Sequence, residues 1–182
     1  MAGSDLELPL ASRLCLACGL CCNGTVYGYA IIREDEVEEA ARIGMNTMRT
    51  MDKSPAFLMA CNWLDGAACT RYTEWRPSIC GDYFCRVQKR AGKQDLTEEQ
   101  AFARIANARR MAEEVKALLP TGMPMSQARH EFRRLAGMHP NLTAEESRFV
   151  VKMFTLERYL DAEFRGADHG HLPAACDSSA GA

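Results

Sequence analysis

The feature that most constrains this chain is a concentration of cysteine in its first half. Eight of its nine cysteines lie between positions 15 and 85. The first eighteen residues include Asp5 and Glu7 and contain neither a basic region nor a continuous apolar run, so they do not have the pattern of a secretory signal. We therefore expect a cytoplasmic protein. Because that compartment keeps thiols reduced, the dense cysteine pattern indicates metal binding or redox chemistry, with disulfides as the main alternative.

The spacing of the first four cysteines favours metal coordination. Cys15, Cys18 and Cys21 are each separated by two residues, which lets neighbouring thiolates turn onto one metal, as in zinc knuckles and ferredoxin-type loops. Cys22 directly follows Cys21, and adjacent side chains normally point in different directions. We therefore predict two four-thiolate sites, with Cys22 in a different site from the other three. The alternative is one cluster shared by all eight predicted ligands, which are Cys15, Cys18, Cys21, Cys22, Cys61, Cys69, Cys80 and Cys85.

The sequence leaves open which metal these thiolates hold and how the distal cysteines pair. Thiolate-only coordination suits both zinc and iron–sulfur clusters, and the ferredoxin-like triplet favours an iron–sulfur cluster. Either kind of site is anionic, so burying it requires compensating donors or cations. Arg71, Arg76 and Arg86 lie among or beside the distal cysteines. We assign Arg76, which precedes Pro77 and is close to Cys80, to this compensating role.

These residues resemble the YkgJ-type cysteine-cluster family, also called the CxxCxxCC proteins. The resemblance covers residues 15–85 and implies a zinc- or iron-chelating domain in which the eight cysteines are the ligands. Members are often labelled Fe–S oxidoreductases, but the resemblance supplies neither a reaction nor a substrate. By the same resemblance Tyr72 and Tyr83, with Arg76, belong to the surroundings of the cofactor. The matching pattern is Cys15-x2-Cys18-Gly19-x-Cys21-Cys22, Cys61-x7-Cys69, Tyr72, Arg76-Pro77, Cys80, Tyr83 and Cys85.

The second half of the chain predicts amphipathic helices. Capping boxes at Thr97 and Thr143 predict the starts of two helices, the first of which ends at Pro120. A shorter helix is predicted over 126–135. The expected fold is mainly α, with a small irregular metal-organised cysteine-rich domain followed by about three amphipathic helices. The expected divisions are a leader (1–14), a cysteine-cluster metal-binding domain (15–93), a helical segment (94–166) and a disordered tail (167–182).

Three shorter segments have their own predictions. Residues 34–51 are rich in helix formers, and we predict one helix there, broken at Gly44. Residues 25–32 contain β-branched and aromatic side chains and predict a short strand or an extended connection. Residues 86–93 are interpreted as a basic linker.

Charge and composition limit the partners that we expect. The net charge of −2 and the lack of aromatic residues within the basic segment do not favour nucleic acid. The apolar runs are too short to span a membrane. Metal ions, and a redox protein as partner, are the expectation.

The leading functional hypothesis is an iron–sulfur protein in redox or electron transfer, with no catalytic residue identified. The alternatives are a zinc-binding module for structure, partner interaction or metal handling, and a metal-dependent group-transfer enzyme with an open coordination position. Two weaker patterns are interpreted without a metal. We expect no role for His169, His171 and Cys176 as an accessory site, and we interpret Met45, Met48, Met51 and Met59 as core packing.

Overall fold

The computed structural model describes residues 8–137 and 142–165, and its fold is mainly α, as the sequence predicts. The helices are α1 (Leu10–Cys18), α2 (Val37–Arg42), α3 (Ile79–Asp82), α4 (Arg86–Gly92), α5 (Glu98–Lys116), α6 (Met125–Ala136) and α7 (Ala144–Leu160). A 3-10 turn, η1 (Glu34–Glu36), precedes α2, and a π-helical turn, η2 (Asp161–Arg165), follows α7. The strands are β1 (Tyr29–Ile31), β2 (Thr47–Arg49), β3 (Pro55–Leu58), β4 (Leu64–Asp65) and β5 (Ala68–Cys69).

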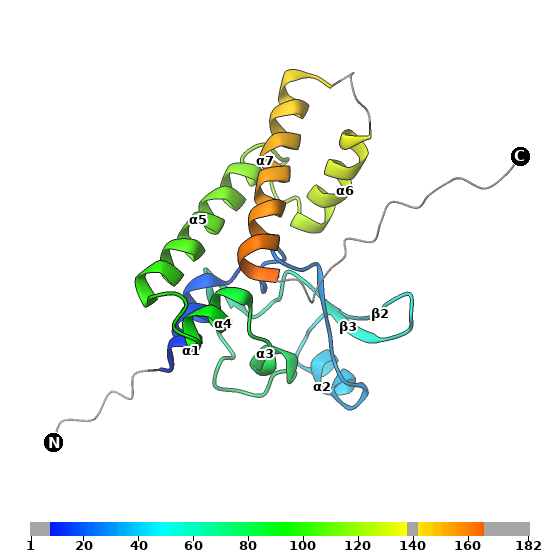
Figure 1. Ribbon diagram of the computed structural model, residues 1–182. Coiled ribbons are helices and arrows are strands. Elements are labelled where there is room, and N and C mark those ends of the chain that lie inside the picture. Colours follow the sequence, from blue (N-terminus) through cyan, green and yellow to red (C-terminus); the bar gives the residue numbers. More distant parts are fainter. Residues whose placement is uncertain (1–7, 138–141, 166–182) are drawn as a thin grey trace, which may run out of the picture.

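The three long helices of the second half pack together, with α7 between α5 and α6 (Figure 1). Both predicted capping boxes are present. The Gln100 N–H donates to the Thr97 hydroxyl at 3.2 Å, and the Thr97 N–H donates to the Gln100 side chain at 3.0 Å. Thr143 and Glu146 make the same pair of bonds at 3.2 and 2.8 Å. The helix starts at these two positions are therefore confirmed, and α6 confirms the predicted helix over 126–135 to within one residue at each end.

The cysteine region and the three helices share one large hydrophobic core. Helices α1 and α4 pack against each other and against one end of α5 (Figure 1). Leu14 and Leu20, from either side of the first cysteines, are buried in the same cluster as Val87, Ile105 and Leu156. A small metal-organised domain buries little apolar surface of its own, so this shared core supplies packing that the cysteine region lacks.

A second, smaller core lies under the three-stranded antiparallel sheet of order β1-β3-β2. Ala30 pairs with Phe57 across β1 and β3, and Thr47 pairs with the same Phe57 from β2. Phe57 is buried with side chains from the η1–α2 segment and its flanks, namely Ile32, Ala40, Ile43 and Met45. The sheet therefore forms a separate packing unit beside the helical core.

Two local predictions were wrong. The helix predicted over 34–51 ends at Arg42, because Gly44 has a positive φ of +85° and residues 47–49 form β2 by pairing with β3. Residues 86–93 are not a linker, since residues 86–92 form α4, in which Val87 and Ala91 are buried. Helix α1 also begins inside the predicted leader, whereas β1 confirms the extended segment predicted over 25–32.

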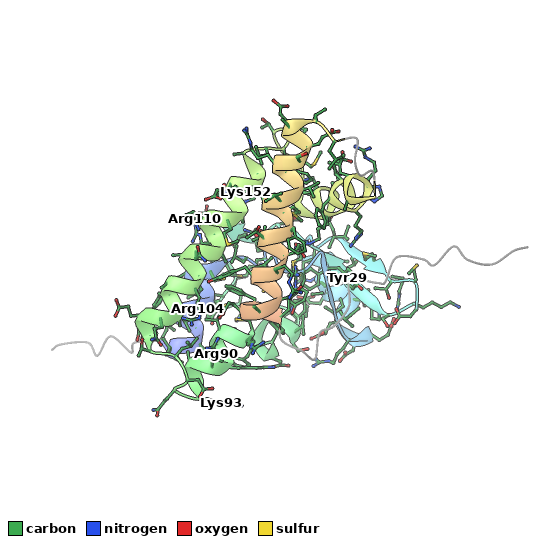
Figure 2. The ribbon with its side chains drawn as sticks, turned by 45° about the horizontal axis from the view of Figure 1, so that its top comes forward. Tyr29, Arg90, Lys93, Arg104, Arg110 and Lys152 are labelled. Atoms are coloured by element: carbon green, nitrogen blue, oxygen red, sulfur yellow. The ribbon has the colours of Figure 1, made fainter. Side chains whose placement is uncertain are left out.

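Several basic side chains on the outer face of the helices are paired with glutamates. Figure 2 shows Arg90 on α4, Arg104 and Arg110 on α5, and Lys152 on α7. Glu163 accepts bonds from Arg90 at 3.0 Å and from Arg104 at 2.8 Å. Glu114 bridges Arg110 and Lys152, the latter at 2.6 Å. These pairs connect neighbouring helices.

None of the helices within the described residues combines the length and apolar character that a transmembrane span requires.

Candidate metal centre

All eight predicted ligands line the same cavity, which has a volume of about 360 Å³. They are free thiols, seven of them half-buried and Cys85 buried. The other lining residues are mostly apolar or aromatic, and Arg71 and Arg76 are the charged side chains among them. The structure therefore brings together cysteines that are as much as seventy positions apart in the sequence.

The first four cysteines are positioned by the end of α1. Cys15 and Cys18 belong to α1, which ends at Gly19 with a left-handed φ of +64°. A turn follows in which Asn23 N–H bonds to the Gly19 carbonyl at 2.9 Å and Gly24 N–H bonds to the Cys21 carbonyl at 3.1 Å. The close spacing of the cysteines thus becomes one helical turn followed by a tight loop.

Glycine is required at position 19 for two reasons. Its φ of +64° is strained for residues with a Cβ, and a Cβ there would lie 2.9 Å from the Cα and carbonyl oxygen of Ala67. Ala67 belongs to the β4–β5 hairpin, which carries Cys69 at its end. Gly19 therefore permits the first cysteine loop to pack directly against the segment that holds a distal cysteine.

The distal cysteines are held by backbone bonds to the rest of the chain. Cys61 N–H donates to the Cys22 carbonyl at 2.7 Å, and Cys69 pairs with Leu64 across the hairpin. Cys80 lies in α3, whose start is held by a 2.7 Å bond from Ser78 N–H to the buried Glu36 carboxylate. These bonds connect the cavity to the sheet and to the η1 turn.

Cys85 is held from the helical side. It precedes the first residue of α4, and its N–H donates to the Gln88 side chain at 2.9 Å. The same Gln88 side chain donates to the Ala11 carbonyl at 2.9 Å, which connects α4 to α1. Cys85 is therefore positioned by the two helices that pack on one end of α5.

Burial makes three of the cavity cysteines weak acids. It is the main reason that the pKa of Cys18, Cys22 and Cys80 is raised from 9.0 to about 12, and neighbouring thiols contribute to that increase. Without metal these thiols are therefore protonated at neutral pH. A metal that binds them must displace those protons, so binding is coupled to proton release.

Arg76 and the two tyrosines predicted beside the cofactor lie at the cavity. The Arg76 guanidinium stacks over the Tyr72 ring at 4.2 Å, and no carboxylate of the described residues forms a salt bridge with it. Arg76, Cys15 and Cys80 line the same cavity, and the positive charge of Arg76 partly opposes the effect of burial on the pKa of both cysteines. Tyr83 donates to or accepts from the Tyr27 hydroxyl at 2.9 Å, and burial raises its pKa.

Arg71 also lines the cavity, but its charge is already matched. It lies 4.9 Å from the Trp63 ring centroid and forms a 2.8 Å salt bridge with Glu74. Arg76 is therefore better placed than Arg71 to compensate the charge of an anionic group in the cavity. Arg86, the third arginine considered, is exposed at the start of α4.

The sequence analysis missed a buried ion network that holds the loop after Cys22. Glu157 of α7 accepts bonds from Arg129 of α6 at 3.0 Å and from Arg165 of η2 at 2.8 Å. The two arginines also donate to the carbonyls of the cysteine loop, from Arg129 to Gly24 (3.0 Å) and Thr25, and from Arg165 to Val26 (2.8 and 3.0 Å). The sequence contained one indication of this network. Arg129 is four residues after Met125, so it lies on the apolar face of its helix, where a charged side chain needs a buried partner.

Two weaker sequence patterns have separate outcomes. Met45 and Met59 line the cavity and pack in the sheet core, as predicted, whereas Met51 is fully exposed, which contradicts core packing there. His169, His171 and Cys176 lie outside the described residues.

The donor set of the cavity fits a metal that prefers sulfur, but not as a preformed single-ion site. Eight thiols with Arg76 beside them suit zinc or iron, both of which accept thiolate ligands. Across residues 8–137 and 142–165, however, no group of three or more His, Cys, Asp or Glu side chains is arranged to hold one metal ion. The thiols are instead distributed around the cavity wall.

Comparison with protein-family models agrees with this donor set. Residues 14–103 match the model "CxxCxxCC: Putative zinc- or iron-chelating domain". These residues belong to the CxxCxxCC family. The matched region contains all eight cavity cysteines and extends into α5. Neither a curated protein nor a solved structure matches the chain in the corresponding comparisons.

Proposed function

We propose that this CxxCxxCC protein binds iron–sulfur clusters through its eight cavity cysteines and acts in redox or electron transfer. The observation that supports this choice is the distribution of the thiols around one cavity of about 360 Å³. The family description names both zinc and iron.

The spread of the thiols favours a cluster over single zinc ions. In a structural zinc site four thiolates contact the same ion at about 2.3 Å, so their sulfurs lie close to one another. In a 4Fe–4S cluster each thiolate binds a different iron, and the sulfurs stand apart around an inorganic core. Thiols that line a shared cavity, with no group of three among the described residues arranged to hold one ion, support the second arrangement.

The charge and polarity of the cavity suit an anionic cluster. Four thiolates give an oxidised 4Fe–4S cluster a net negative charge, and Arg76, which has no salt bridge to a carboxylate of the described residues, supplies a positive charge in the same cavity as Cys15 and Cys80. Apolar and aromatic residues form most of the wall. Solvent exclusion and nearby cations are the means by which proteins adjust cluster potentials. When bound, the cluster would supply one-electron chemistry, and the chain's residues would hold it and set its potential.

Zinc is the second candidate, favoured by the family description and by the thiol-only donor set. In that case the cysteines would have to move inward on binding, because each group of four must meet one ion. The metal would then stabilise the fold and serve partner interaction or metal handling.

Metal and acid-labile sulfide analysis of protein purified without oxygen tests the proposal. Iron with matching sulfide, brown colour and a reversible reduction in the visible spectrum is the expected result. About two zinc ions per chain, no sulfide and no visible absorbance would overturn the iron–sulfur proposal and establish the zinc alternative. A matched sample of the Cys176→Ser variant, which retains all eight cavity cysteines, shows whether the ninth cysteine contributes metal.

A further inference from the structure

The eight cysteines reach the cavity from two different packing units. Cys18, Cys21 and Cys85 pack against the large core that contains α5 and α7. Cys61 and Cys80 pack against the small core beneath the three-stranded sheet. Cysteines that share a packing unit are held together by it, so the two cores divide the ligands into a helical side and a sheet side.

Backbone contacts assign Cys22 and Cys69 to the sheet side. Cys22 accepts the 2.7 Å bond from Cys61 N–H, which joins these two residues directly although Cys22 is adjacent to Cys21 in the sequence. Cys69 lies in β5, whose partner strand β4 begins three residues after Cys61.

Cys15 belongs with the helical side through α1. It is three residues before Cys18 on the same helix, a spacing that places side chains on a common face. Helix α1 also contacts strand β5, which carries Cys69, so the helix that carries Cys15 borders the other group.

We infer that the CxxCxxCC domain holds two separate four-cysteine centres with defined membership. The helix-side centre consists of Cys15, Cys18, Cys21 and Cys85, and the sheet-side centre consists of Cys22, Cys61, Cys69 and Cys80. This inference rests on the proposed metal binding but not on the identity of the metal. In the sequence pattern CxxCxxCC, the first three cysteines therefore belong to the helix-side centre and the last, Cys22, belongs to the sheet-side centre.

The two centres differ in how firmly the protein holds them. The helix-side group is embedded in the core shared by α1, α4, α5 and α7, whereas the sheet-side group depends on two-residue strands, a four-residue helix and a small core. Elements with few buried contacts open more readily. The sheet-side centre therefore loses its metal to a chelator first.

Cysteine variants in pairs test the membership. Cys21→Ser and Cys61→Ser should each lower the metal content of anaerobically purified protein by about half. The double variant Cys22→Ser/Cys61→Ser, within one group, should lose no more than Cys61→Ser alone. The double variant Cys21→Ser/Cys61→Ser, across the groups, should lose nearly all metal, and Cys176→Ser serves as the unaffected control.

Several outcomes would overturn the inference. Complete loss of metal in either single variant would mean one shared cluster, and complete loss in the within-group double variant would mean that Cys22 and Cys61 belong to different centres. Because a serine variant can fail to fold, the wild-type protein gives a second test. After partial chelation, thiol alkylation and mass spectrometry should label the four sheet-side cysteines as a set while the helix-side four stay protected. Labelling that mixes the two sets overturns the membership.

The failure of the proposed function gives a different result. If wild-type protein contains zinc without sulfide, the iron–sulfur proposal is wrong, but total zinc still reports the two centres and the same variants test them. If wild-type protein binds neither metal, both the proposed function and the two centres are wrong.

Discussion

Glu157 is the residue through which the helices hold the cysteine loop, and its removal gives a sharp prediction. Its carboxylate binds Arg129 at 3.0 Å and Arg165 at 2.8 Å, and these three side chains are only 7 to 10% exposed. The change Glu157→Gln keeps the shape and one acceptor oxygen but removes the negative charge. Two guanidinium groups then remain buried near each other without their common counterion.

The expected cost is about 3 kcal/mol of unfolding free energy. Removing one partner of a buried ion pair typically costs about 3–5 kcal/mol, because the remaining charge is left uncompensated. The lower end applies here, since Arg165 keeps Asp161 at 2.8 Å and both arginines keep the carbonyls of the cysteine loop. For a chain of this size that corresponds to a fall in melting temperature of roughly 6–12 °C.

The measurement is urea and thermal unfolding of wild type and Glu157→Gln, with metal content determined on the same samples. The matched control is Glu114→Gln, which also removes a glutamate that bridges two cations, but on the surface. Exposed pairs contribute at most about 1 kcal/mol, so the control should shift little. Equal effects of the two substitutions would refute the reasoning. We also expect Glu157→Gln to retain less metal, because the loop after Cys22 loses part of its anchor.

Three further perturbations test the positioning of the cavity. Gly19→Ala should reduce stability and metal content more than Gly66→Ala, by metal analysis and melting, because both glycines have positive φ but only position 19 also meets backbone at 2.9 Å. Although burial opposes ionisation of Glu36, hydrogen bonds from two backbone N–H groups hold its pKa below 4.5. The ionised carboxylate therefore stabilises the fold fully above pH 4.5, and this stabilisation is lost as the pH falls through the lower pKa of the folded state. In unfolding experiments at different pH, Glu36→Gln should reduce the loss of stability at acid pH. Arg76→Gln should lower the reduction potential measured by redox titration, because a nearby positive charge favours the more negative reduced cluster. Arg71→Gln should change the potential less, because the charge of Arg71 is paired with that of Glu74.

The parts of the fold that were predictable are those set by local rules. The capping boxes at Thr97 and Thr143 depend on residues three positions apart, so the sequence contains all the information needed to place the starts of α5 and α7. The cysteines were recognisable as a set for a similar reason, since their number and spacing are visible without knowing how the chain folds. Their arrival at one cavity agrees with that interpretation.

Nonlocal contacts account for the predictions that were wrong. Residues 47–49 have neighbours rich in helix formers, but they pair with β3, and only the fold reveals that partner. The segment 86–93 has many basic residues, yet Val87 and Ala91 bury its other face against the large core. Composition identified its polar side and missed the two apolar positions that make it a helix. Glu157 was invisible for the same reason, because its partners lie 28 and 8 positions away.

The helices outside the matched family region have a more specific role than general support. Stabilisation through the shared core would require only apolar contacts, but Arg129 and Arg165 reach into the cysteine region and bind three consecutive carbonyls after Cys22. Those carbonyls belong to the loop that directly follows Cys22, the first of the sheet-side cysteines. Because a charged clamp holds this loop, it helps to fix where Cys22 lies relative to the helices. The C-terminal helices therefore help to determine that two adjacent cysteines serve different centres, and loosening the clamp should affect sheet-side metal before helix-side metal.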